Sequence, residues 1–307
     1  MTDKIRILQE QLGTIIKGKK EVTDKIIMAV LAKGHVLLED VPGVGKTTTA
    51  LALSRLMGMD FQRIQFTPDV VPSDVTGFTM YQKETGTFVY RPGAVMCNFL
   101  LADEINRTSS KTQAALLEVM EEGRVTVDGE THEVPKPFVV LATENPVGSS
   151  GTQMLPESQL DRFMVSLSMG YPDHESLVEI LRDRQDTNPL DHAETVVHKE
   201  ELLKLQEQVQ KVYMDDRILS YVADLAEATR AHALITLGLS PRGTLALIQS
   251  AKAMAMLRGR DYLLPDDIMP LCQDVLAHRI LTKGGVAAEQ VLDEVLHQVP
   301  APMPDRR

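Results

Sequence analysis

The sequence predicts an α/β domain built on a parallel five-stranded sheet, followed by an all-helical domain. Five short apolar runs have the length of strands, and they alternate with helical segments in the first half of the chain. Several of these runs are apolar without alternation, as expected for strands that are buried on both faces of a parallel sheet. From residue 172 onward only helical patterns follow. We therefore predict two domains, residues 1–171 and 172–307.

The predicted strands end in turns or polar residues; they are His35–Glu39, Phe61–Phe66, Phe99–Ala102, Phe138–Ala142 and Met164–Met169. Helices are predicted where apolar residues share one face of a 3.6-residue period. Between and before the strands these helices are Glu21–Ala32, Thr47–Met57 and Lys111–Glu122. Gly123 is placed to end the last of them, because glycine adopts the left-handed conformation that closes a helix.

Two short hairpins are expected to interrupt the alternation of strands and helices. One is Phe78–Tyr90, turning around Glu84–Gly86, and the other is Val125–Val134, with Asp128-Gly129 as its tight turn. The helices predicted for the second domain are His174–Arg184, Lys199–Val212, Asp216–His232, Pro241–Leu257, Pro265–Leu281 and Ala287–Gln298.

The composition disfavours several classes of protein. The net charge of −11 argues against unspecific attraction to nucleic-acid phosphates, and 4% aromatic residues leave few platforms for base stacking. Cys97 and Cys272 have no second Cys or His at metal-binding spacing, so we expect buried free thiols in a reducing compartment. The first residues lack the apolar core of a signal peptide, and no apolar run is long enough to span a membrane. These features predict a cytoplasmic protein.

A glycine-rich turn between the first strand and the next helix predicts a phosphate-binding loop. Its residues are Pro42, Gly43, Val44, Gly45, Lys46, Thr47 and Thr48. The two glycines let backbone N–H groups point at phosphate oxygens, and the helix adds its positive end. Lys46 would reach the β- and γ-phosphates of ATP, and the Thr47 hydroxyl would ligate Mg²⁺. The full pattern has glycine where this chain has Asp40, and an Asp side chain can cap local N–H groups there.

Polar residues follow two further strands where the ligand crevice of a parallel sheet is expected. Asp103 and Glu104 end the Phe99–Ala102 strand. Asp103 would hold Mg²⁺ directly or through water, and Glu104 would orient and deprotonate the attacking water. Asn145 follows the next strand along the chain, where its amide could lie between Glu104, the water and the γ-phosphate.

Two arginines have competing interpretations. Arg162 precedes the fifth strand, after a loop at residues 148–153, and it could be a surface residue paired with Asp161. Arg242 follows Ser240-Pro241, a helix start with Ser as N-cap, and it could pair with a nearby acid. Both gain a functional meaning if ATP binds where domains or neighbouring subunits meet.

Taken together, these motifs resemble the MoxR family of AAA+ ATPases. The resemblance is carried by LLEDVPGVGKTTTA, FTPDVVPSDVTGF, RPGAV, LLADEINRTSSKTQAALLEVMEEGRVTVDG, VVLATENP, LPESQLDRF and SPRG. It implies a P-loop AAA+ αβα core followed by a helical lid, with Phe78–Tyr90 as the helix-2 insert and Val125–Val134 as the pre-sensor-1 hairpin.

The resemblance also assigns roles to single residues. It implies that Asn145 is sensor 1, that Arg242 is sensor 2, and that Arg162 is an arginine finger offered to a neighbouring subunit's ATP. Gly18 matches the segment that packs near adenine. The family more often has a Gly-Gln pair there, and this chain has Lys19 in the second position.

By the same resemblance, the protein is expected to be a homo-oligomer, typically a hexameric ring. The expected function is ATP hydrolysis coupled to chaperone-like remodelling or activation of a protein client, including metal-cofactor insertion, with a von Willebrand factor A domain partner. A DNA translocase or helicase is the alternative from another class. The Val125–Val134 hairpin carries Asp128, Glu130 and Glu133 and no Lys or Arg between its ends, which disfavours nucleic acid.

Two further alternatives stay open beside these. The motor subunit of a metal chelatase shares most of the motifs and would be told apart by its partner subunits. A nucleotide-dependent switch with negligible turnover is disfavoured because Glu104 is present.

Overall fold

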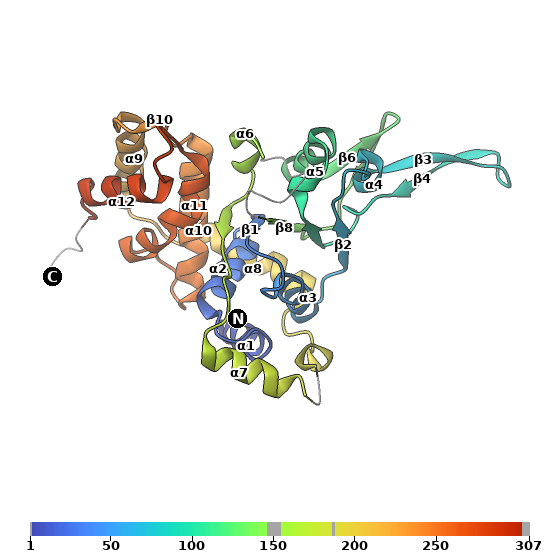
Figure 1. Ribbon diagram of the computed structural model, residues 1–307, viewed down its shortest axis with the longest axis horizontal. Coiled ribbons are helices and arrows are strands. Elements are labelled where there is room, and N and C mark those ends of the chain that lie inside the picture. Colours follow the sequence, from blue (N-terminus) through green and yellow to red (C-terminus); the bar gives the residue numbers. More distant parts are fainter. Residues whose placement is uncertain (1, 146–154, 186–187, 303–307) are drawn as a thin grey trace.

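A five-stranded parallel sheet forms the centre of the N-terminal half of the molecule in the computed structural model, which describes residues 2–145, 155–185 and 188–302 (Figure 1). Its strands are β1 (Val36–Glu39), β2 (Phe61–Gln65), β5 (Phe99–Asp103), β8 (Val139–Glu144) and β9 (Val165–Leu167). Their order in the sheet is β2-β5-β8-β1-β9, and every neighbouring pair is parallel. The sequence-based prediction of a five-stranded parallel sheet is confirmed.

The central strands are buried on both faces because alternate side chains enter two different hydrophobic cores. Leu100 and Val140 point into the core beneath α5, whereas Leu101 and Leu141 point into the core shared with the C-terminal helices. Edge strand β2 is mostly exposed. This arrangement explains why the central strands are apolar without alternation.

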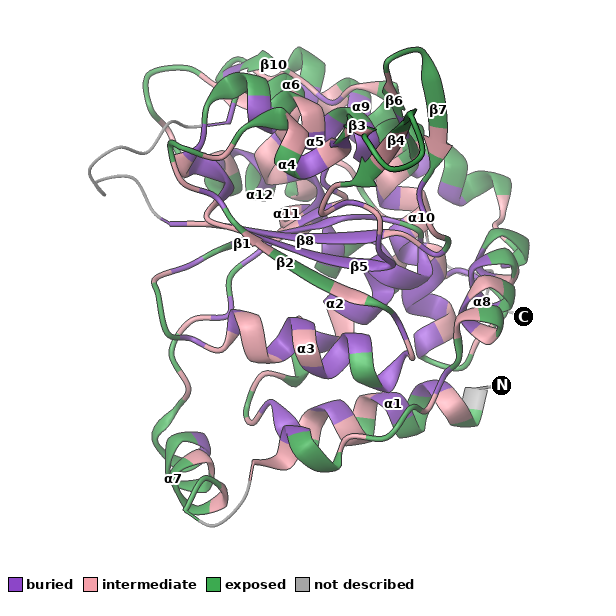
Figure 2. Cartoon of the chain, turned by 90° about the vertical axis from the view of Figure 1, so that its right-hand side faces the viewer, coloured by how far each residue is buried: buried purple, intermediate pink, exposed green. Residues whose placement is uncertain are grey.

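Helices cover both faces of the sheet (Figure 2). On one side lie α1 (Thr2–Ile15), α2 (Lys20–Leu31) and α3 (Lys46–Leu56), and on the other lie α4 (Pro72–Thr76) and α5 (Ser110–Glu122). A short 3-10 helix, η1 (Ile105–Arg107), follows β5. The Ser109 side chain caps α5 by accepting from the N–H of Thr112, and Gly123 ends it at φ 64°, as predicted.

Both predicted hairpins are present. The strands β3 (Gly77–Gln82) and β4 (Thr87–Pro92) form an antiparallel ribbon that projects away from the sheet (Figure 1). The strands β6 (Arg124–Val127) and β7 (Glu130–Glu133) form the second. Asp128 and Gly129 join them with φ values of 49° and 85°, the two positive values that a tight hairpin turn of this kind requires.

The C-terminal part is mainly helical, with α7 (His174–Asp183), α8 (Lys199–Lys211), α9 (Asp216–Ala231), α10 (Pro241–Leu257), α11 (Cys272–Leu276) and α12 (Ala288–Gln298), after the short α6 (Glu157–Leu160). Four single-turn 3-10 helices lie among them, namely η2 (Pro189–His192), η3 (Pro265–Asp267), η4 (Met269–Leu271) and η5 (Ala277–Arg279). The helix start predicted at Ser240-Pro241 is confirmed, because the Ser240 hydroxyl accepts from the N–H of Gly243 at 3.1 Å.

Two details of the helical prediction are wrong. A short antiparallel pair, β10 (Ile235–Leu237) and β11 (Leu281–Thr282), lies among the helices. The helix expected at Pro265–Leu281 is broken into η3, η4, α11 and η5. Pro270 contributes to the break, because proline has no N–H to continue a helical ladder and its ring clashes with the preceding turn.

The N-terminal helices contact the C-terminal ones, since α10 packs against both α1 and α2. The domain boundary proposed between residues 171 and 172 stays a prediction. Pro146 of the VVLATENP motif and the loop expected at residues 148–153 lie outside the described residues. Among the described residues, no helix combines the length and apolar character that crossing a lipid bilayer requires.

Candidate functional site

The glycine-rich turn adopts the conformation that a phosphate loop requires. Gly43 and Gly45 have φ values of 87° and 100°, which residues with a Cβ atom rarely adopt. Gly45 is the N-cap of α3, so the helix begins at Lys46 and its first N–H groups face the loop. Such a helix start attracts anions through its free N–H groups and its dipole.

Asp40, which stands where the usual loop pattern has glycine, does not have the capping role expected from the sequence. Its carboxylate does not cap N–H groups of its own turn. It accepts instead from the Ser168 hydroxyl at 2.9 Å, from the Gly170 N–H at 3.1 Å and from the Met169 N–H. Asp40 is almost fully buried, so it fastens the start of the loop to the segment after β9.

Lys46 lies in the loop with its ammonium held by backbone. Its Nζ donates to the Asp40 carbonyl oxygen at 2.7 Å, and the residue is only 8% exposed. Burial lowers the pKa of Lys46, while the negative charges of Asp40, Asp103 and Glu104 act in the opposite direction. The Lys46 ammonium therefore lies near three carboxylates and is largely shielded from water.

Asp103 ends β5 with both carboxylate oxygens engaged. Arg63 of β2 donates to Oδ2 at 2.6 Å, and the Thr143 hydroxyl of β8 donates to Oδ1 at 2.7 Å. Asp103 and Thr143 lie near the carboxyl ends of neighbouring parallel strands, and Arg63 reaches Asp103 from the middle of the adjacent strand β2.

Glu104 adopts a left-handed backbone conformation at φ 58°, an uncommon state for a residue with a side chain. The Asn145 amide donates to its Oε1 at 2.8 Å, and Arg107 donates to Oε2 at 2.7 Å. Burial raises the pKa of Glu104, but the hydrogen bonds from Arg107 and Asn145 outweigh it, so the net pKa lies below the ordinary value. Glu104 is therefore ionised at neutral pH. The predicted neighbourhood of Asn145 and Glu104 is present.

A polar cavity of about 390 Å³ collects these groups. It is lined by Pro42, Gly43, Gly45, Lys46, Thr47, Thr48, Arg63, Gln65, Asp103, Glu104 and Asn145. Thr47 and Asp103 offer hydroxyl and carboxylate oxygens on the same cavity, which is the donor chemistry that Mg²⁺ prefers. Since Mg²⁺ usually takes one or two protein ligands beside phosphates and water, this pair fits the ion.

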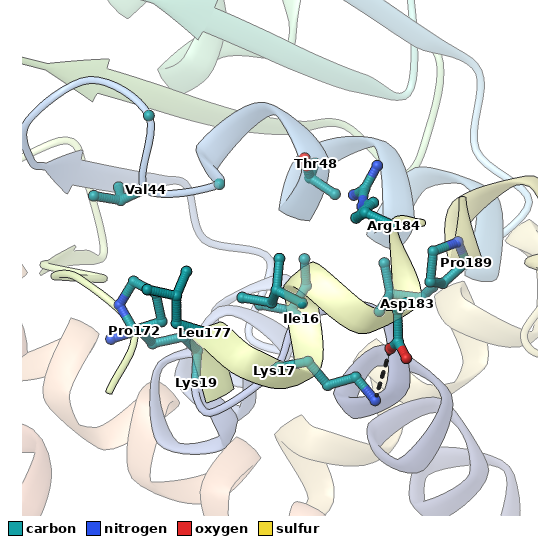
Figure 3. Close-up of a pocket in the computed structure, with 14 residues that line it drawn as sticks. Ile16, Lys17, Lys19, Val44, Thr48, Pro172, Leu177, Asp183, Arg184 and Pro189 are labelled. Carbon is teal, nitrogen blue, oxygen red and sulfur yellow. Dashed lines mark ion pairs between the residues drawn. The ribbon is translucent and has the colours of Figure 1, made fainter. Parts of the chain in front are cut away.

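A second cavity, of about 290 Å³, adjoins the first through Gly43, Gly45 and Thr48. Figure 3 shows Val44 and Thr48 along one side, with Ile16, Pro172 and Leu177 facing them. Its exposed lining is mostly apolar, so it suits a flat base better than a phosphate. Residues from the segment after α1, from the phosphate loop and from α7 thus converge on one pocket.

Gly18 lies beside this apolar cavity and does not line it, whereas Lys17 and Lys19 do. Lys17 pairs with Asp183 at 3.3 Å, and Lys19 donates to the Tyr171 carbonyl oxygen at 2.7 Å. Gly18 has φ 68° and faces Ser176 of α7 so closely that a Cβ would lie 2.1 Å from the serine hydroxyl. The glycine therefore permits α7 to approach the cavity.

Arg162 and Arg242 line neither of these cavities; both bind Glu121 at the end of α5. Arg162 Nε donates to one carboxylate oxygen at 3.0 Å, and Arg242 donates to the other. The pairing of Arg162 with Asp161 considered from the sequence is not present, because Asp161 binds Arg279.

Several residues of the site were not found from the sequence. Arg63 and Arg107, which bind the two carboxylates, carry no local signal, because their contacts depend on how strands and turns meet. The apolar residues of α7 that face the second cavity, Leu177 and Ile180, could have been found from the amphipathic pattern of that helix.

Comparison with known proteins places the chain in a family of ATPases. Residues 35–165 match the family model described as "ATPase family associated with various cellular activities (AAA)", and residues 227–298 match an AAA lid domain. The chain is 48% identical to the protein YeaC of Bacillus subtilis, over 96% of this chain and 93% of that protein. It is 39% identical to Chaperone MoxR1 of Mycobacterium tuberculosis, over 93% of this chain and 78% of that protein.

The fold has a close counterpart among solved structures. A crystal structure of a protein from Cytophaga hutchinsonii superimposes with a TM-score of 0.91 at 37% identity, covering 98% of this chain and 96% of that one. The sheet and the helical lid agree with these relationships, and the chain belongs to the MoxR family of AAA+ ATPases.

Proposed function

We propose that this chain binds ATP with Mg²⁺ and hydrolyses it, and that it does so as an oligomer whose sites are completed by a neighbouring subunit. One observation carries the proposal. A single cavity is lined by Lys46, Thr47, Asp103, Glu104 and Asn145, and it adjoins a mostly apolar pocket. The two predicted arginines line a different cavity.

Within this proposal each residue of the cavity has a distinct part in phosphoryl transfer. Lys46 and the N–H groups of the loop bind the phosphates, and Thr47 and Asp103 hold Mg²⁺, which supplies charge neutralisation when bound. Glu104, ionised at neutral pH, accepts the proton of the attacking water. Asn145 orients Glu104 through its amide hydrogen bond and faces the same cavity.

The positions of Arg162 and Arg242 support the proposed assembly. An arginine that reaches the transition state of phosphoryl transfer is worth about 10³ to 10⁵ in turnover. Since both arginines line a cavity other than the chain's own loop cavities, we propose that a neighbouring subunit's ATP receives them. A closed ring, with six subunits as the expected number, places every such arginine at an interface.

The proposed work of the ATPase is remodelling or activation of a protein client in the cytoplasm, with metal-cofactor insertion and a von Willebrand factor A domain partner as the finer form of the proposal. A relative named as a chaperone supports the general role. The projecting β3–β4 hairpin adds support, because it exposes apolar side chains, including Phe88 at 74% and Tyr81 at 52%. Such a surface suits protein contact.

Charge disfavours a nucleic-acid motor as the alternative. The β6–β7 hairpin presents Asp128, Glu130 and Glu133, and the whole chain has a net charge of −11. A DNA-tracking surface would gather Lys and Arg, because phosphate contacts supply most of the affinity.

The test is ATP hydrolysis against protein concentration, with Mg²⁺, for the wild type, Glu104→Gln and Arg162→Ala. We expect specific activity to rise with concentration, and both variants to lose it while still binding ATP. Equal amounts of the two variants, mixed, should regain activity, because one keeps its base and the other its arginine. Arg124→Ala, which removes an exposed arginine paired with Glu122, is the control and should retain wild-type turnover.

A concentration-independent rate in a protein that sediments as a monomer, with Arg162→Ala fully active, would refute the shared-site proposal.

A further inference from the structure

A single carboxylate holds the two proposed trans-acting arginines together. Arg162 comes from the segment between α6 and β9, and Arg242 comes from the first turn of α10. Each arginine donates to a different oxygen of Glu121, so both carboxylate oxygens accept a hydrogen bond. Glu121, Arg162 and Arg242 are far apart in the sequence, and their contact joins the sheet domain to the helical lid.

Glu121 stands at a place where a carboxylate is otherwise disfavoured. It is in the last turn of α5, next to Glu122, and that turn contains no basic residue. The negative end of the helix dipole repels carboxylates at this position. Burial raises the pKa of Glu121, but Arg242 and Arg162 outweigh this effect and keep it below the ordinary value. The two guanidiniums therefore compensate a charge that the helix end does not favour.

A third arginine fixes the peptide that carries Arg162. Arg279, almost fully buried, donates to the Asp161 carboxylate at 2.8 Å and to the Phe163 carbonyl oxygen at 2.6 Å. Its charge is thus neutralised by Asp161. The backbone on both sides of Arg162 is thereby anchored, while the Arg162 side chain depends on Glu121 for its direction.

The surroundings leave this cluster with an excess of positive charge. The cavity of about 310 Å³ beside it is lined by Lys33 and by all three arginines, with Glu121 and Asp161 as its acids. His35 also lines it, and burial lowers the pKa of this histidine to about 4, so it is neutral at physiological pH. Arg162 and Arg242 thus share one carboxylate beside a cavity whose basic side chains outnumber its acidic ones.

From this arrangement we infer that Glu121 is a positioning residue: it sets Arg162 and Arg242 side by side, so that one subunit delivers both guanidiniums together to the phosphates of a neighbour's nucleotide. This inference rests on the proposed function above. Glu121 touches neither the nucleotide nor the water; it acts through the two arginines. Its loss should lower turnover in the neighbouring subunit and leave ATP binding in its own subunit unchanged.

Mixed oligomers test the inference. Arg162→Ala subunits keep their own Glu104 and act as acceptors, and Glu104→Gln subunits keep their arginines and act as donors. We place Glu121→Ala on either the donor or the acceptor and measure ATP turnover of the mixture. On the donor it should reduce the recovered kcat by roughly 10- to 100-fold, the usual effect of a misplaced catalytic group. On the acceptor it should have little effect, which also shows that the variant folds and assembles.

The matched control is Glu122→Ala, which removes the neighbouring exposed carboxylate and should leave recovery unchanged in the donor. Equal recovery with Glu104→Gln donors that do or do not carry Glu121→Ala would overturn the inference, and so would a gain of activity on removing Glu121. If the unmodified donor and acceptor recover nothing when mixed, the shared-site proposal itself fails, so the two failures are distinguishable.

Discussion

Nη1 of Arg107 lies 2.7 Å from Oε2 of Glu104, three residues away along the chain. The contact spans the single turn of η1, at whose start Glu104 has its left-handed conformation. The other oxygen of Glu104 is held by Asn145. Both oxygens of the proposed general base are thus held by neighbouring side chains, which sets its direction and keeps it ionised.

Arg107→Ala should move the pH dependence of hydrolysis. Although burial raises the pKa of Glu104, the Arg107 hydrogen bond is the largest effect that lowers it, so its removal raises the pKa. Because the base must be ionised, we expect the acid limb of the kcat profile to shift to higher pH. The profile of Arg124→Ala serves for comparison. An unchanged acid limb in Arg107→Ala would show that Glu104 does not govern it.

Asp40→Gly restores the usual glycine of the phosphate loop, yet we expect it to destabilise the protein. The buried carboxylate accepts from the Met169 and Gly170 N–H groups and from Ser168, and these donors would lose their partner. An unsatisfied buried group costs about 1–3 kcal/mol. Urea unfolding followed by far-UV circular dichroism measures the loss, since the chain contains no tryptophan.

The control for this change is Asp60→Gly, which removes an exposed carboxylate paired with Lys199 and should cost about 1 kcal/mol or less beyond the effect of the glycine itself. Equal free energies of unfolding for the two variants would contradict the role given to Asp40.

Asp267→Asn should destabilise the lid. The Asp267 side chain is fully buried and accepts from Arg260 at 2.5 and 2.7 Å, from Arg258 at 2.8 Å and from the Leu264 N–H at 2.9 Å. Breaking a buried pair by removing one partner costs about 3 kcal/mol. Arg258 is nearly half exposed, so Arg260 accounts for most of the effect. Asp266→Asn, at an exposed neighbouring position, is the control and should leave the unfolding midpoint unchanged.

The same carboxylate predicts how stability responds to pH. Burial raises the pKa of Asp267, but the hydrogen bonds from Arg260 and Leu264 lower it by more. The net pKa therefore lies below the ordinary value. A folded-state pKa below the unfolded one stabilises the protein above the unfolded value, and this contribution is lost as pH falls through the folded value. The difference between wild type and Asp267→Asn should therefore shrink on acidification below the ordinary pKa of an aspartate.

Local patterns sufficed for the individual strands, both hairpins and the phosphate loop, because each of these depends on residues close together in the chain. The helix α1 was missed although Ile5, Leu8, Leu12 and Ile15 show its period and are all buried. The break at residues 265–281 was missed because its apolar pattern is helical, whereas Pro270 and tertiary contacts decide otherwise.

The pattern of partners within the site could not be predicted in this way. Asp103 and Glu104 were found as carboxylates at a strand end, but their partners Arg63 and Arg107 follow only from the folded backbone. The shared binding of Arg162 and Arg242 to Glu121 is likewise a contact between elements that no spacing reveals. Motifs therefore predict which residues belong to the site, whereas the hydrogen bonds among them depend on contacts between distant parts of the chain.

Gly18→Ala should weaken ATP binding. Gly18 has φ 68°, where a side chain costs about 1–2 kcal/mol, and its Cβ would meet the hydroxyl of Ser176 at 2.1 Å. Ser176 belongs to α7, which lines the apolar cavity through Leu177 and Ile180, so a shift of that helix opens the cavity. We expect the Kd for ATP, measured by calorimetry on a Glu104→Gln background, to rise by about tenfold.

Gly13→Ala provides the matched control. A Cβ at Gly13 meets no atom within 4 Å, and the position lies inside α1, where alanine favours the helix. Its Kd should equal that of the background. Adding Ser176→Gly to Gly18→Ala removes the atoms that clash and should restore part of the affinity. If Gly18→Ala binds ATP as tightly as Gly13→Ala, the approach of α7 does not shape the pocket, and the apolar cavity is not where the base binds.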